Sequence, residues 1–180
     1  RTPFGDAPIN SEVAKAIQSN SAYIDVDDKA HLYEHSIELQ LPFLQYVLVS
    51  DFDFVPISMM LQDFEVALDV GRAAAKAVEG LNVVIIASSD MTHYEPQTTA
   101  ERKDHMLIRA IEKLDEEEIF KNADKHEVSM CGVGPAVAMV TASKKLGAKR
   151  GTLLKYATSG DITGDRSSVV GYCSMTTTKT

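Results

Sequence analysis

The apolar run Val83-Val84-Ile85-Ile86-Ala87 passes without a break into Ser88-Ser89-Asp90-Met91-Thr92-His93. An uninterrupted β-branched run is typical of a strand that is buried on both faces of a sheet. In open α/β sheets, ligands bind beyond the carboxyl ends of the strands. This stretch therefore predicts a central strand over residues 83–87 that delivers polar side chains to the edge of a crevice.

Helical and strand-like patterns alternate on both sides of this run. The expected helices cover residues 11–17, 36–48, 63–79, 99–114, 115–124 and 134–146, and the other long strands cover 52–60, 152–157 and 168–175. Such alternation predicts an α/β fold with helices on both sides of a mixed sheet. The last two strands are candidates for antiparallel pairing, because nothing helical lies between them. Pro42 is expected to bend its helix, since an interior proline removes a hydrogen bond.

The composition restricts the class of protein. The chain has 180 residues, 44% of them hydrophobic and 24% charged, and a formal net charge of −8. This apolar content suits one globular domain and excludes a disordered chain. No apolar run approaches the roughly 18 residues that span a membrane, and the acidic balance argues against nucleic acid as a partner. Two cysteines are too few for a disulfide scaffold, so a cytoplasmic location is expected.

Asp90 and His93 follow the central strand and are the first candidate functional pair. A carboxylate can fix the tautomer of an imidazole, and the ring then moves protons near neutral pH. The alternative is an aspartate that caps a local turn beside a surface histidine. Their place at the end of a buried strand is the argument for a functional role.

Cys131 precedes Gly132 and the predicted helix over residues 134–146. Backbone N–H groups at a helix start favour a thiolate, which can bind a metal or act as a nucleophile. A buried structural cysteine is the alternative, but the glycines at 132 and 134 indicate that the backbone approaches another segment closely. Cys131 and His93 do not complete a metal site, because a catalytic transition ion normally takes three protein ligands.

Two further polar segments are weaker candidates. Residues 31–38 hold two histidines and two acids, which suits a metal site or an acid–base pair, or else a solvated helix start. Residues 158–165 contain hydroxyls, glycines and acids that either bind a polar ligand or only connect two strands. The sequence has neither GxGxxG nor a Walker motif, so nucleotide binding by those routes is unsupported.

Four motifs occur in order along almost the whole chain. They are Glu34-His35-Ser36-Ile37-Glu38-Leu39-Gln40-Leu41-Pro42, Ser88-Ser89-Asp90-Met91-Thr92-His93, Met130-Cys131-Gly132-Val133-Gly134-Pro135 and Tyr156-Ala157-Thr158-Ser159-Gly160-Asp161. Together they resemble the Memo family, whose bacterial and archaeal members are often called AmmeMemoRadiSam system protein B. The family's fold is similar to that of the class III non-haem iron extradiol dioxygenases. The resemblance implies a three-layer α/β sandwich with a mixed, mainly parallel sheet, and one Memo-like domain over residues 1–180.

The resemblance also assigns roles. In the family, two histidines and one cysteine hold a metal, and the cysteine matches Cys131. His93 matches the residue that handles protons in the related dioxygenases, with Asp90 as a partner near the site. The residues expected to line the pocket are Glu34, His35, Gly132, Ser159 and Asp161.

The family's two metal-binding histidines have no counterpart in this sequence. They belong to segments resembling PHAGY and GPNH, and Arg1-Thr2-Pro3-Phe4-Gly5 resembles the stretch that follows them. We therefore expect the sequence to be the C-terminal two-thirds of a longer domain rather than a short family member. Loss of the first strands would expose a long unpaired edge of the sheet.

Two functions follow from this resemblance. The first is a metal-dependent, dioxygenase-like protein that performs oxidative chemistry on an unknown small molecule, with iron or copper as the metal and zinc as a further candidate. The second is a non-catalytic scaffold that binds a peptide or phosphopeptide in the same crevice. The acidic net charge opposes an anionic ligand. The substrate, the metal and the oligomeric state are not set by the sequence.

Overall fold

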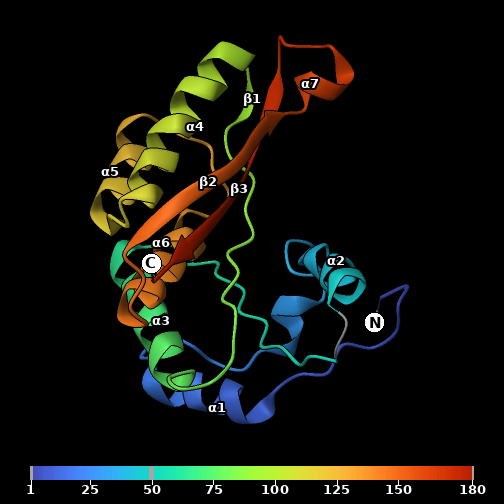
Figure 1. The fold of residues 1–180 in the computed structure, drawn as a ribbon, viewed down its shortest axis with the longest axis vertical. Coiled ribbons are helices and arrows are strands. Elements are labelled where there is room, and N and C mark those ends of the chain that lie inside the picture. Colours follow the sequence, from blue (N-terminus) through green and yellow to red (C-terminus); the bar gives the residue numbers. More distant parts are fainter. Residues whose placement is uncertain (1, 49–50, 180) are drawn as a thin grey trace.

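A computed structural model describes residues 2–48 and 51–179 (Figure 1). Arg1, the first residue of the N-terminal motif, lies outside the described residues. The elements are α1 (Ser11–Asn20), the 3₁₀ helix η1 (Asp28–His31), α2 (Gln40–Val47), α3 (Phe64–Ala77), β1 (His93–Glu95), α4 (Gln97–Glu112), α5 (Glu116–Lys125), α6 (Val133–Lys145), β2 (Arg150–Thr158), α7 (Gly160–Thr163) and β3 (Val169–Thr178).

The structure confirms an α/β fold in which helices flank a sheet. Within the described residues, the sheet has three strands in the order β1-β3-β2, and both pairings are antiparallel. The antiparallel pairing of the two closing strands is thus confirmed, whereas the parallel part of the predicted sheet is not among these strands. Helix α4 lies against β2 and β3 (Figure 1). Its Leu107 and Ile108 are fully buried in this contact.

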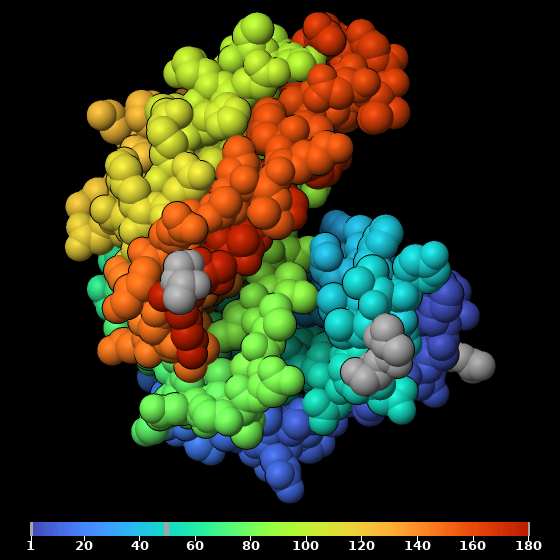
Figure 2. Space-filling view, in the orientation of Figure 1, coloured from blue at the N-terminus to red at the C-terminus, as the bar shows by residue number. Residues whose placement is uncertain are grey.

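The described structure does not confirm the predicted strand over residues 83–87. The segment is extended, but it forms no ladder with any described strand, and Val84 is 85% exposed. A groove of 460 Å³ separates it from the part of β3 that contains Cys173 and Met175. Figure 2 shows this hollow between the red strand and the green segment. A β-branched pattern favours an extended conformation, but a strand forms only where a neighbouring strand pairs with the segment.

The predicted strand over residues 52–60 is also largely unpaired. Its only bridge among the described residues is parallel, between Ile9 and Phe54. The predicted helix over residues 36–48 begins later, at Gln40. Pro42 therefore lies in the first turn, where its missing N–H has no intrahelical partner, and the expected bend has no cause.

The larger helices lie close to their predicted positions. Asp115 caps α5 by accepting a hydrogen bond from the Glu118 N–H at 2.8 Å. Gly147 follows α6 with a positive φ of 98°. At Gly71, α3 approaches α6 so closely that a Cβ would lie 2.5 Å from the Ala138 carbonyl oxygen. The resulting core holds α6 in place, and α6 in turn carries the candidate cysteine at its start.

No helix in the described parts of the chain is both long enough and apolar enough to cross a membrane.

Candidate functional site

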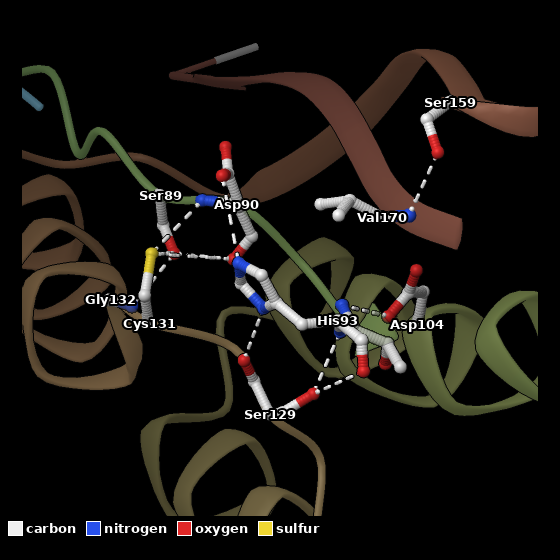
Figure 3. A network of polar contacts seen from close by, with 10 residues as sticks. Ser89, Asp90, His93, Asp104, Ser129, Cys131, Gly132, Ser159 and Val170 are labelled. Atoms are coloured by element: carbon white, nitrogen blue, oxygen red, sulfur yellow. Dashed lines mark hydrogen bonds and ion pairs between the residues drawn. The ribbon is translucent and has the colours of Figure 1, made fainter. Parts of the chain in front are cut away.

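Two segments meet at the site, residues 89–93 and residues 129–132 (Figure 3). The Ser89 hydroxyl joins them, because it accepts a hydrogen bond from the Gly132 N–H at 2.8 Å and donates one to the Asp90 carbonyl at 2.7 Å. A Cβ at position 132 would lie 2.6 Å from the Ser89 Cβ. The predicted close approach of backbone at Gly132 is therefore confirmed, and the residue it approaches is Ser89.

Cys131 lies immediately before the N-cap of α6, and its thiol is free and exposed. Its Sγ atom accepts a hydrogen bond from the Asp90 N–H at 3.3 Å, and the Ser89 hydroxyl oxygen lies 3.5 Å away. Cys131 is thus not the buried structural cysteine of the alternative interpretation. Its sulfur is accessible from solvent and is held beside the backbone of Asp90.

The His93 ring is held by Ser129. Its Nδ1 lies 2.7 Å from the Ser129 carbonyl oxygen, and its backbone N–H donates to the Ser129 hydroxyl at 2.7 Å. A carbonyl oxygen only accepts hydrogen bonds, so Nδ1 carries the proton. In the neutral ring, Nε2 therefore presents its lone pair.

Asp90 faces that free nitrogen. Its Oδ2 lies 3.6 Å from His93 Nε2, and the side chains of His93 and Asp90 are 21% and 48% exposed. The Asp90 carboxylate therefore lies beside the ring nitrogen of His93 that carries no proton in the neutral form. The next residue, Tyr94, has a positive φ of 58°, a backbone conformation that is strained for a non-glycine residue.

Ser129 and Gln62 also organise the site, although no sequence pattern marks them as functional. The Gln62 amide donates to the Cys131 carbonyl and accepts from the Gly134 N–H, both at 2.9 Å. Gln62 comes from the turn before α3, far from Cys131 in sequence. No local pattern marks such a residue, since its role depends on a tertiary contact.

Glu34 and His35 lie on a separate segment. The Glu34 carboxylate accepts hydrogen bonds from the Ser36 hydroxyl and the Ile37 N–H at 3.0 and 2.9 Å, and so stabilises its own turn. The segment reaches the site through Ser88, whose hydroxyl donates to the Ser36 carbonyl at 2.9 Å. The motif thus contacts the extended segment at Ser88, two residues before Asp90.

Ser159 and Asp161 lie at the connection between β2 and β3. The Asp161 carboxylate accepts hydrogen bonds from the Thr158 N–H at 2.7 Å and from the Gln97 amide at 3.2 Å. The Thr158 N–H bond is the main cause that lowers the pKa of Asp161. Ser159 accepts from the Val170 N–H at 3.1 Å, and Val170 pairs with His93 (Figure 3). These hydrogen bonds of Ser159 and Asp161 stabilise the connection between β2 and β3.

The described residues bring Asp90, His93, Cys131 and Gly132 together. Within residues 2–48 and 51–179, no three His, Cys, Asp or Glu side chains are grouped so that they could hold a metal ion.

Comparison with known proteins gives the same family as the motifs. The sequence profile of a family described as "Memo-like protein" matches residues 1–176. The chain belongs to the Memo family. It is similar to MEMO1 family proteins of Methanococcus maripaludis (50% identical over 180 residues, covering 97% of this chain and 63% of the relative) and Methanocaldococcus jannaschii (49% over 179 residues, 97% and 62%).

A MEMO1 family protein of Methanococcoides burtonii is 48% identical over 176 residues, covering 97% of this chain and 66% of the relative. This Memo family chain thus spans less than two-thirds of the length of these relatives.

Proposed function

We propose that this Memo family member is a metal-binding, dioxygenase-like protein in which Cys131 is a thiolate ligand and His93 with Asp90 moves a proton beside it. One observation carries the proposal: Asp90 joins both groups. Its backbone N–H donates to Cys131 Sγ at 3.3 Å, while its carboxylate lies 3.6 Å from His93 Nε2. A ligand atom and an acid–base pair are therefore held by the same residue.

The donor chemistry fits a transition metal. A thiolate with imidazoles suits copper(I), zinc and iron alike, so we propose iron or copper and retain zinc as a candidate. Cys131 supplies one donor, and we propose that two histidines outside these 180 residues supply the others, because catalytic sites normally have three protein ligands. When bound, the metal would supply Lewis-acid or redox chemistry on a small molecule of unknown structure.

The residues of this chain have a defined part in that chemistry. The Ser129 carbonyl keeps the proton on His93 Nδ1, so that Nε2 is the atom that accepts a proton from a bound molecule. The Asp90 carboxylate then lies next to the positive charge. Because both side chains are partly exposed, a small molecule can approach them from solvent.

The mainly parallel sandwich is proposed on related grounds. Residues 83–87 are extended and apolar but lack a neighbouring strand, and the 460 Å³ groove lies along one side. The relatives are longer than this chain by more than a third of their own length. We propose that the additional length contributes strands that pair with residues 83–87 and complete the sheet.

The scaffold function receives less support. A phosphopeptide would have to approach the Asp90 carboxylate, which is 48% exposed, on a chain of net charge −8. Like charges in contact oppose such binding. A cytoplasmic location remains part of the proposal, since Cys131 and Cys173 are both free thiols.

Metal analysis tests the proposed function. The protein that carries this chain together with the additional length of its relatives should hold about one metal ion per chain. The Cys131→Ala variant should lose that metal, and the control variant Cys173→Ala should keep it. Metal at background level in the parent protein, or full retention in Cys131→Ala, would contradict the proposal. The 180-residue chain alone should bind the metal weakly.

A further inference from the structure

Asp104 is a buried carboxylate outside the proposed reacting groups. It lies on α4 and is 0% exposed. Its Oδ1 accepts a hydrogen bond from the Thr92 N–H at 2.9 Å, and its Oδ2 accepts one from the Tyr156 hydroxyl at 2.7 Å. Burial, followed by the hydrogen bond to Asp104, raises the pKa of Tyr156, so the phenol stays protonated and remains the donor.

The contact with Thr92 reaches the backbone immediately before His93. The Thr92 carbonyl accepts a hydrogen bond from the Gly171 N–H at 2.9 Å, and the Met91 N–H donates to the Gly171 carbonyl at 2.9 Å. β3 thus holds this segment from one side, while Asp104 holds it from α4. The two residues between Asp90 and His93 are fixed by these bonds.

Gly171 and Asp104 are matched in space. A Cβ at position 171 would lie 1.9 Å from Asp104 Oδ2, so no other residue fits there without displacing the carboxylate. A buried carboxylate is unfavourable unless its hydrogen bonds compensate for lost hydration. An apolar residue would fill the position on α4 without that penalty. Only a hydrogen-bond acceptor at this position can take the hydrogen bond from the Thr92 N–H.

We propose that Asp104 is a positioning residue that acts through the Thr92 backbone to hold His93 against Ser129 and Asp90. This inference rests on the proposed function, because that function gives the position of the His93 ring its importance. The position itself does not depend on a metal. Asp104 touches none of the reacting groups. Its effect is on where the His93 ring lies.

Side-chain NMR of the histidines in the metal-free protein tests this role. The His93 ring signals, assigned with His93→Gln, should shift in Asp104→Ala, because the Thr92 N–H loses its acceptor. They should stay in place in Asp104→Asn, which keeps an oxygen for that N–H. The matched control is Tyr156→Phe, which removes only the bond to the other carboxylate oxygen. It should leave His93 unshifted and move His105, whose ring lies 4.9 Å from that of Tyr156.

Unshifted His93 signals in a folded Asp104→Ala variant would overturn the proposal. Equal shifts of His93 in Asp104→Ala and Tyr156→Phe would also overturn it, because they would reflect general loosening of the core. If Asp104→Ala does not fold, Asp104→Ser provides the same comparison, since its shorter side chain does not reach Thr92. Loss of metal binding by the longer protein would refute the proposed function while leaving these NMR results unaffected.

Discussion

Thr92 and Thr158 are both buried, but only the Thr158 hydroxyl has a hydrogen-bond partner among the described residues. Among the described residues, nothing bonds to the Thr92 hydroxyl, whereas the Thr158 hydroxyl donates to Asp161 at 3.2 Å. A buried hydroxyl without a partner is unfavourable by about 1–3 kcal/mol. The role of Thr92 therefore belongs to its backbone, and its hydroxyl is dispensable.

This difference gives a paired prediction for stability. Thr92→Val should unfold at the same or a higher denaturant concentration, because the variant keeps the shape and removes the unpartnered hydroxyl. Thr158→Val should lose about 1 kcal/mol of unfolding free energy. Chemical denaturation of both variants measures the difference. A larger loss in Thr92→Val than in Thr158→Val would show that the Thr92 hydroxyl has a partner.

Asp161 predicts a pH dependence of stability. Its pKa is lowered from the usual 3.8, first by the Thr158 N–H bond, so the ionised form is favoured in the folded state. The stabilisation is complete above the unfolded pKa and is lost as the pH falls through the lower folded pKa. The stability advantage of the parent over Asp161→Asn should therefore shrink below about pH 4. An advantage that is constant from pH 7 to pH 2 would contradict this.

The two cysteines should differ in reactivity. Burial raises the pKa of the Cys173 thiol to about 11, and the Asp104 charge adds to this, whereas Cys131 is exposed. Because the thiolate is the nucleophile, iodoacetamide at pH 8 should modify Cys131 first. Peptide mass spectrometry over time measures both rates. Modification of Cys173 at an equal or greater rate would mean that this thiol is not buried in solution.

At the scale of elements, local signals predicted the helices well. The Asp115 cap and Gly147 mark helix ends through residues that are close in sequence, so these ends can be predicted from the sequence. Residues 83–87 have a β-branched pattern but no paired neighbour among the described strands, and no local pattern reveals whether a neighbour is present. The start of α2 was also missed, because Glu34 caps a separate turn before it.

Hydrogen exchange tests the proposed completion of the sheet. In the 180-residue chain, amides of residues 83–87 should exchange within the fastest class, while those of β3 paired with β2 stay protected. In the longer protein, the amides of residues 83–87 should become protected as well. Fast exchange of residues 83–87 in the longer, folded protein would contradict the proposal that strands pair with them.

At the scale of the whole molecule, the sequence indicates the candidate residues better than the residues that hold them in place. Asp90, His93 and Cys131 are candidates from the sequence because an apolar run ends just before the first two and a predicted helix follows the third. Ser129, Gln62 and Asp104 were missed, because each acts across a long sequence separation. The composition suits one domain, yet the chain covers only 63% of a close relative's length.

X-ray absorption at the metal edge of the longer protein tests the central claim, that Cys131 binds the metal. We expect one sulfur neighbour at about 2.3 Å, together with lighter nitrogen or oxygen neighbours. The sulfur signal should disappear in Cys131→Ala, even when metal is added back, and persist in Cys173→Ala. A spectrum without sulfur in the parent protein, or with the same sulfur signal in Cys131→Ala, would contradict the account.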